Sequence, residues 1–166
     1  LILGGTGFIG PHQVRYAQER GHTVTLFNRG KTNPGLFPNV EKLQGDRAVG
    51  DYSALKGREW DVVIDNPITL PRWVRQAAEV LKGHAKQFVF VSTISVYDKN
   101  DTPGADETAA VGTTTEPESE DARRLYGPLK ALAEGEARKA FGERATIIRP
   151  GLIVGPGDLS DRFTYW

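Results

Sequence analysis

Short, mostly apolar runs alternate with longer segments of helical hydrophobic periodicity along the chain. Runs of this kind are typical of strands buried on both faces of a parallel sheet. They predict six strands, over residues 1–3, 23–28, 40–44, 61–64, 87–92 and 145–149. The intervening segments predict helices over residues 8–20, 52–55, 71–82 and 120–141. Such strand–helix alternation predicts an α/β fold with a doubly wound parallel sheet.

A glycine-rich loop follows the first predicted strand. Gly4, Gly7 and Gly10 have the spacing G-x-x-G-x-x-G. The first glycine permits a tight turn, the middle one lets the backbone approach a pyrophosphate, and the last lets the following helix pack closely. The N-terminus of that helix would add unpaired N–H groups for the anion. The loop therefore predicts a dinucleotide site, with an ordinary tight turn as the alternative.

The residues after the second and third strands indicate which dinucleotide the site would hold. Asn28 and Arg29 stand about twenty residues past the loop, where NAD-binding folds carry an acid for the adenosine ribose. Because no acid is present, Arg29 either pairs with the 2′-phosphate of NADP, with Lys31 nearby, or is a solvated turn residue. Asp46, after the third strand, either accepts a hydrogen bond from adenine or forms a turn with Gly45.

Polar residues also follow the fourth and fifth strands. Asn66 precedes Pro67, which ends the strand and favours an extended conformation before it. We expect the Asn66 backbone near the cofactor, while its side chain either lines the cofactor or shapes the turn. Ser92 and Thr93 end the fifth strand, and their hydroxyls either donate to a substrate oxygen or cap the strand.

Tyr126 and Lys130 are four positions apart in the last predicted helix, so they lie on one helix face. An ammonium close to a phenol favours the phenolate and brings its pKa of about 10 towards neutral pH. The alternative for this common spacing is an exposed pair without chemistry. Gly127 and Pro128 are unfavourable inside a helix, so the helix is irregular or restarts there.

Composition limits the classes of function. The 166 residues suffice for one domain, and 21 basic against 21 acidic residues give no net charge. A neutral chain argues against bulk binding to nucleic acid or to an anionic membrane. The absence of cysteine excludes disulfides and a thiolate nucleophile, and the three scattered histidines suggest no metal site. These features favour a cytoplasmic enzyme, and the absence of methionine leads us to expect a fragment of a longer protein.

The order of these motifs resembles the extended short-chain dehydrogenase/reductase superfamily, and more narrowly the NAD-dependent epimerase/dehydratase family. The motifs are the glycine loop, Gly-Asp after the third strand, Ser-Thr after the fifth, Tyr-x-x-x-Lys, and Arg-Pro followed by Gly-Pro-Gly after the sixth. The resemblance covers the whole chain. It implies a dinucleotide-binding Rossmann domain over residues 1–157 and the start of a truncated substrate region over residues 158–166.

The resemblance also implies residue roles. Thr93 would hold the substrate oxygen, Tyr126 would exchange its proton, and Lys130 would bind the nicotinamide ribose and lower the pKa of Tyr126. Together with the strand-end residues above, it gives a candidate cofactor site of Gly4, Gly7, Phe8, Ile9, Gly10, Asn28, Arg29, Asp46, Asn66, Ser92, Tyr126, Lys130 and Pro150.

The activity so implied is hydride transfer between NADP or NAD and a hydroxyl or carbonyl substrate. The expected substrate is a nucleotide sugar, and the protein could form a homodimer. Arg29 in place of the acid predicts that NADP binds at least as well as NAD. Asp98 follows Tyr97 where the family usually has glycine, so the substrate-side turn is expected to differ. The chain also resembles bacterial epimerase-like proteins similar to chloroplast stem-loop-binding proteins. A non-catalytic RNA-binding or cofactor-sensing protein is therefore the alternative.

Overall fold

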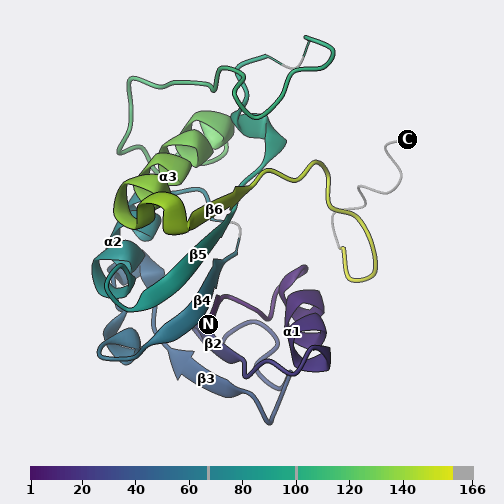
Figure 1. The fold of residues 1–166 in the computed structure, drawn as a ribbon, viewed down its shortest axis with the longest axis vertical. Helices are drawn as coiled ribbons and strands as arrows, with labels where there is room; N and C mark the ends of the chain where they lie inside the picture. Colours follow the sequence, from purple (N-terminus) through teal and green to yellow (C-terminus); the bar gives the residue numbers. More distant parts are fainter. Residues whose placement is uncertain (67, 100, 159–166) are drawn as a thin grey trace.

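A parallel six-stranded sheet in the order β3-β2-β1-β4-β5-β6 forms the centre of the molecule (Figure 1). The structure is a computed structural model that describes residues 1–66, 68–99 and 101–158. The strands are β1 (Ile2–Leu3), β2 (Thr25–Asn28), β3 (Glu41–Gln44), β4 (Trp60–Asp65), β5 (Ala85–Val91) and β6 (Ala145–Ile148). The predicted doubly wound fold is confirmed, and its strand order reverses between β1 and β4.

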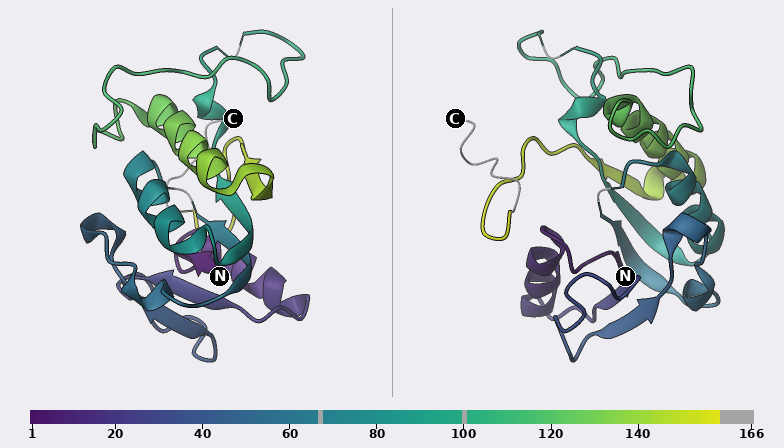
Figure 2. Two further views of the ribbon diagram at one scale, coloured as in Figure 1. Left: turned by 60° about the vertical axis from the view of Figure 1, so that its left-hand side comes forward. Right: turned by 180° about the vertical axis from the view of Figure 1, so that it is seen from behind.

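The helices cover opposite faces of the two halves of this sheet. Helix α1 (Gly10–Glu19) lies on one face, and α2 (Pro71–Leu81) and α3 (Tyr126–Phe141) pack together on the other (Figures 1 and 2). Single turns of 3-10 helix complete the described chain, at η1 (Arg47–Val49), η2 (Ser53–Leu55), η3 (Ile94–Val96) and η4 (Gly142–Arg144). Within the described ranges, no helix has the length and apolarity needed to cross a membrane.

Each face of the sheet has its own apolar core. On the face of α2 and α3, Phe88 and Phe90 are fully buried, and Phe88 stacks on Phe141 with ring centroids 4.3 Å apart. On the face of α1, Val14 and Leu26 are fully buried. Burial on both faces agrees with the apolar β1 and the apolar end of β5, whereas the edge strand β3 is partly exposed and mostly polar.

Helix α3 begins later than the predicted residue 120, at Tyr126. Proline has no N–H to donate to the carbonyl four residues before it, and its ring would clash with that carbonyl. Pro128 therefore fits only the first turn of the helix, where no such bond is needed. The preceding turn is instead held by Arg124, whose guanidinium binds Glu116 at 2.8 and 2.9 Å and Asp121 at 3.2 Å. The expected alternatives were an irregular helix or a restart at Gly127–Pro128, but the described residues from 101 to 125 contain no helix, and α3 has its start at Tyr126.

Other boundaries differ by a few residues. Helix α1 begins at Gly10, not at the predicted residue 8, and Ile9 is its N-cap. Gly21 ends α1 in the left-handed conformation with φ +78°, as a C-terminal cap requires, whereas Gly83 does not have a positive φ. The predicted substrate region over residues 158–166 lies outside the described residues except for Asp158.

Candidate functional site

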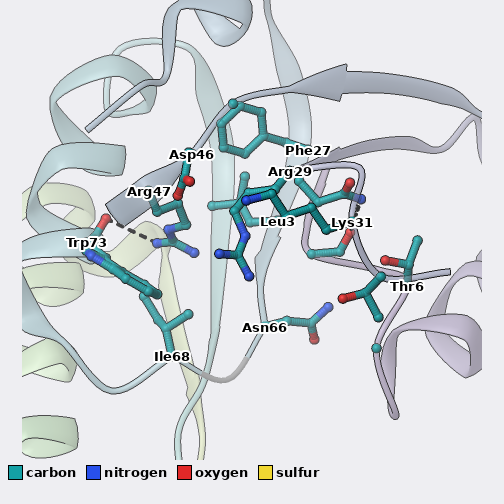
Figure 3. Close-up of a pocket in the computed structure, with 15 residues that line it drawn as sticks. Leu3, Thr6, Phe27, Arg29, Lys31, Asp46, Arg47, Asn66, Ile68 and Trp73 are labelled. Carbon is teal, nitrogen blue, oxygen red and sulfur yellow. Dashed lines mark hydrogen bonds between the residues drawn. The ribbon is translucent and has the colours of Figure 1, made fainter. Parts of the chain in front are cut away.

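The carboxyl ends of the strands open into two adjoining cavities at the reversal of strand order, where doubly wound sheets bind ligands. The β2-side cavity has a volume of about 250 Å³ and is lined by Arg29, Lys31, Asp46, Arg47 and Trp73, among others (Figure 3). The β5-side cavity has a volume of about 830 Å³ and is lined by Phe8, Thr93, Ser95, Arg123 and Tyr126, among others. Gly4, Gly7 and Asn66 line both cavities, which makes the pair one continuous candidate site.

The glycine loop has the geometry needed for close packing and for an open ligand side. A Cβ at Gly10 would lie 2.5 Å from the backbone of Gly5, so α1 packs on the loop only because position 10 is glycine. A Cβ at Gly7 would meet no atom within 4 Å, so this glycine faces open space within both cavities. No side chain in the described part of the protein caps the start of α1, but Pro11 has no N–H and the N–H groups of His12 and Gln13 donate to the Ile9 carbonyl at 3.2 and 3.3 Å, so the Gly10 N–H is the first-turn donor left for an anion.

Asn28 occupies the position where an acid was expected, and its side chain holds the loops together. Its Nδ2 donates to the Gly4 carbonyl at 2.9 Å, and its Oδ1 accepts from the Gly30 N–H at 2.8 Å. Asn33 adds a second tie by donating to the Thr6 carbonyl at 3.0 Å. Asn28 therefore lines the β2-side cavity while it fixes the glycine loop against the end of β2.

The end of β3 carries a capping carboxylate and an arginine. Asp46 accepts from the Ala48 N–H at 2.9 Å and so caps η1, which agrees with its interpretation as a turn residue. Arg47 donates two hydrogen bonds to Asp65, at 2.5 and 2.9 Å, and a third to the Trp73 carbonyl at 3.1 Å (Figure 3). Burial opposes the charge of Arg47, but the partner Asp65 outweighs it and raises the pKa of Arg47.

Asn66 has an unsatisfied amide between the two cavities. Both its Oδ1 and its Nδ2 are buried without a hydrogen-bond partner among the described residues. Such groups are rare in native proteins because a buried, unpaired amide costs about 1–3 kcal/mol. An amide that lines both cavities is therefore placed to hydrogen-bond a ligand that spans them. This observation is the best evidence that the residues present fit a dinucleotide.

The hydroxyls after β5 have distinct partners. The Ser92 hydroxyl donates to the buried carboxylate of Glu134 at 2.5 Å. Thr93 Oγ1 accepts from the Ser95 N–H at 3.1 Å and lies 3.2 Å from the Ser95 hydroxyl, so Thr93 caps η3. Both residues also line the β5-side cavity, so capping and exposure to a ligand occur together. Pro150, which follows β6, lines the same cavity, and its carbonyl accepts from the Ile94 N–H at 3.0 Å.

The start of α3 packs directly against η3. A Cβ at Gly127 would overlap the Ser95 carbonyl oxygen, so only glycine allows this approach. The approach puts Tyr126 on the wall of the cavity that Thr93 lines, with 40% of its surface exposed. The packing thus brings together a phenol and a hydroxyl that lie 33 positions apart in the sequence.

Lys130 follows Tyr126 by one helical turn and is fully buried. Its ammonium donates to the main-chain carbonyls of Val91 at 2.6 Å and Ile68 at 3.0 Å, and lies 4.3 Å from the centre of the Phe90 ring. Burial lowers the pKa of Lys130 to about 8, although the charges of Asp65 and Glu134 act in the opposite direction. Lys130 does not contribute to the lining of the β5-side cavity as the described residues define it.

The residues of the site that the sequence predictions missed include Arg47, Trp73 and Arg123. Arg47 directly follows the predicted Asp46, and Trp73 lies at the start of a predicted helix, but no local pattern indicates that either lines a cavity. Arg123 lines the β5-side cavity from the turn before α3. Its neighbour Arg124 is paired with two acids, whereas no ion pair of Arg123 is found in the described part of the chain.

The described residues contain no cluster of side chains that could hold a metal ion.

Comparison with known proteins gives two family matches that together span most of the chain. A family described as Male sterility protein, with an NAD-binding domain, matches residues 72–166. The NAD dependent epimerase/dehydratase family matches residues 1–55.

Curated relatives differ in their described roles. The chain is 32% identical over 94% of its length to the chloroplast stem-loop binding protein of 41 kDa b from Arabidopsis thaliana, covering 42% of that protein. It is 31% identical over 95% of its length to a 2-alkyl-3-oxoalkanoate reductase from Stenotrophomonas maltophilia, covering 52% of it. A crystal structure of UDP-galactose 4-epimerase matches with a TM-score of 0.67 and 26% identity, over 89% of this chain and 54% of that one. The chain thus spans about half the length of the relatives it matches.

Proposed function

Because the chain belongs to the NAD-dependent epimerase/dehydratase family of extended short-chain dehydrogenases/reductases, we propose that the protein is an NAD(P)-dependent oxidoreductase. It would act by hydride transfer on a substrate with a hydroxyl or carbonyl group. One observation carries this proposal: Thr93 and Tyr126 share the wall of one cavity, which the open glycine loop also lines. A volume of about 830 Å³ lies within the usual range for small-molecule sites.

The residues that would hold the cofactor follow from the two cavities. The backbone around Gly4 and Gly7, with the first turn of α1, would bind the pyrophosphate, and Asn66 would hydrogen-bond to the cofactor between the cavities. Arg29 and Lys31 line the β2-side cavity and favour the 2′-phosphate of NADP. Bound NAD(P) would supply the hydride acceptor or donor, while the protein supplies orientation and electrostatics.

The side chains of this protein would manage the proton and the substrate oxygen. Tyr126 would take the proton from the substrate hydroxyl when the carbon is oxidised, and return it when the carbonyl is reduced. Thr93 would donate a hydrogen bond to the same oxygen. Lys130 would place its positive charge one helical turn from Tyr126.

For the substrate we propose a nucleotide sugar or another molecule with an anionic group. Arg123 carries the only charged side chain among the described residues that line the β5-side cavity. Since Arg124 holds the turn through Glu116 and Asp121, Arg123 is left to meet an anion such as a phosphate.

Replacement of Tyr126 tests the activity. The full-length protein is mixed with NADPH or NADH, and binding is followed by nicotinamide fluorescence. Turnover is followed with a panel of nucleotide sugars and oxo compounds. Tyr126→Phe should abolish turnover with little change in cofactor affinity, whereas the exposed Tyr16→Phe should change neither. Failure of the protein to bind either cofactor would refute the proposal, and full turnover by Tyr126→Phe would refute the role of Tyr126.

A second candidate function is RNA binding, which the 32% identity to the Arabidopsis stem-loop binding protein favours. Binding to RNA phosphates requires a basic face and weakens steeply with salt. A stem-loop RNA titrated at two salt concentrations distinguishes the candidates. Tight binding that falls with salt would support the RNA function, and no binding would exclude it.

A further inference from the structure

Two buried carboxylates lie on elements that Lys130 contacts: Asp65 is the register partner of Phe90, whose ring the ammonium meets, and Glu134 is one helical turn from Lys130. Asp65, at the end of β4, is fully buried and takes both hydrogen bonds of the Arg47 fork. Glu134 is 2% exposed and receives Arg149 at 2.6 and 2.9 Å. Bidentate pairs of this kind fix the carboxylates in position.

Glu134 also contacts the candidate site by a second path. It lies one helical turn beyond Lys130, on the helix face that carries Tyr126 and Lys130. Its Oε1 accepts from the Ser92 hydroxyl at 2.5 Å, next to Thr93 on the cavity wall. A single carboxylate thus joins the helix of the proposed proton donor to the strand end that holds the substrate oxygen.

The surroundings of Lys130 explain why a buried ammonium needs these carboxylates. Its hydrogen-bond acceptors are neutral carbonyls, and the Phe90 ring adds only a weak attraction. The charged groups that act on Lys130 are Asp65 from β4 and Glu134 from α3, the helix of Lys130 itself. The titratable Tyr126 also lies on α3. Arg47 pairs with Asp65, and both Arg149 and, at 3.9 Å, Arg138 pair with Glu134. Without the two negative charges, desolvation would favour the neutral amine.

We propose that Asp65 and Glu134 are positioning residues that keep Lys130 an ammonium during catalysis, and that Glu134 in addition fixes Ser92 beside Thr93. The proposal concerns the charge of Lys130, and its kinetic consequence rests on the proposed oxidoreductase activity. It predicts that loss of either negative charge shifts Lys130 towards the neutral amine while the cavity and its lining residues stay in place.

Glu134→Gln is the direct test, because glutamine keeps the shape and can still accept from Ser92. In the full-length protein with cofactor and substrate, the alkaline limb of the kcat profile should move to lower pH by on the order of one unit. The matched control is Glu136→Gln, an acid on the same helix that pairs with Arg75 of α2 and should leave the profile unchanged. Glu134→Asp keeps the charge and should restore most of the wild-type profile.

A direct titration keeps this test independent of turnover. Carbon-13 NMR of the lysine side chains, with the Lys130 signal assigned by its loss in Lys130→Met, reports the protonation of Lys130 itself. The pKa of Lys130 should be lower in Glu134→Gln than in the wild type. Equal values would overturn the inference even if the enzyme is active, and a lower value would support it even if no substrate is found. If Glu134→Gln does not fold, Asp65→Asn is titrated instead, with the same expected direction.

Discussion

Asn66 and Lys130 are two buried polar residues, and the loss of stability that their burial causes points to a functional role. Asn66 lines both cavities, and neither atom of its amide has a partner in the part of the chain that the structure describes. Lys130 is fully buried as a cation among neutral carbonyls and an aromatic ring. Each arrangement costs stability, which natural proteins accept mainly at working sites.

Replacing Asn66 should separate cofactor affinity from stability. Asn66→Ala removes an amide that has no partner within residues 1–66, 68–99 and 101–158, so the free energy of unfolding should stay within about 1 kcal/mol or rise. Cofactor affinity should fall by about 10- to 100-fold, since a hydrogen-bonding group is lost. Fluorescence titration and chemical unfolding measure the two quantities. Gln76→Ala, which also removes a buried unpaired amide oxygen but lies outside both cavity linings, should leave affinity unchanged.

Replacing Lys130 should raise stability and remove activity. The pKa of Lys130 is lowered from 10.5 to about 8, so the folded state disfavours the charge. Below pH 8 Lys130 is protonated in both the folded and the unfolded state, and the full cost of burying its charge lowers the stability of the fold. Between pH 8 and 10.5 the unfolded state binds more protons than the folded state, so the free energy of unfolding rises with pH. Lys130→Met should therefore unfold with a free energy higher by on the order of 1–3 kcal/mol at pH 7.

Urea unfolding of Lys130→Met and wild type at pH 7 and pH 10 checks the sign. The excess of the variant's free energy of unfolding over that of the wild type should shrink at pH 10. At that pH the folded wild type holds Lys130 largely as the neutral amine, so folding no longer has to bury the full charge. An advantage that grows with pH would contradict the assigned direction of the pKa shift.

At the scale of elements, the contact between α3 and η3 sets the geometry of the site. Gly127 gives the close approach, since a Cβ there would overlap the Ser95 carbonyl. Gly127→Ala should destabilise the protein by about 1–3 kcal/mol and lower kcat, because Tyr126 would be displaced from Thr93. Gly135→Ala lies on the same helix, exposed and with no atom near the added Cβ, and should instead stabilise it by about 0.5–1 kcal/mol. Thermal unfolding and kcat of the two variants give the comparison.

The elements were largely predictable because their patterns are local. All six strands and the main helices follow from apolar runs and periodicity, and Gly4, Gly7 and Gly10 mark the loop. The start of α3 was wrong by six residues because helical propensity before Tyr126 was given more weight than Pro128. The pairing of Arg47 with Asp65 could not be predicted, since it depends on where the separate strands β3 and β4 end in space. The partner of Ser92, Glu134, is hidden from sequence reasoning for the same reason.

At the scale of the whole molecule, the two cavities lie on different halves of the sheet. The β2-side cavity is formed largely by the ends of β1, β2 and β3, and the β5-side cavity by residues after β5 and β6 and before α3. A dinucleotide that fills both would contact the helices on opposite faces through their adjoining loops. Ligand binding to the folded state alone raises stability, by about 2.7 kcal/mol at a hundredfold excess over Kd. Thermal unfolding of the whole protein therefore reports which dinucleotide binds.

Arg29 and Lys31 lead us to expect that NADPH raises the midpoint of thermal unfolding at least as much as NADH at equal concentration. The two cofactors differ by one phosphate on the adenosine ribose, so a difference between them must arise in the β2-side cavity. Arg29→Asp places a carboxylate where it can accept from ribose hydroxyls and repel that phosphate. The variant should be stabilised more by NADH than by NADPH. The same substitution at Arg20, which is exposed on α1 and outside the β2-side cavity, should not change the order. If wild type and Arg29→Asp respond equally to both cofactors, Arg29 does not meet the ribose, and the absence of an acid after β2 does not decide the cofactor.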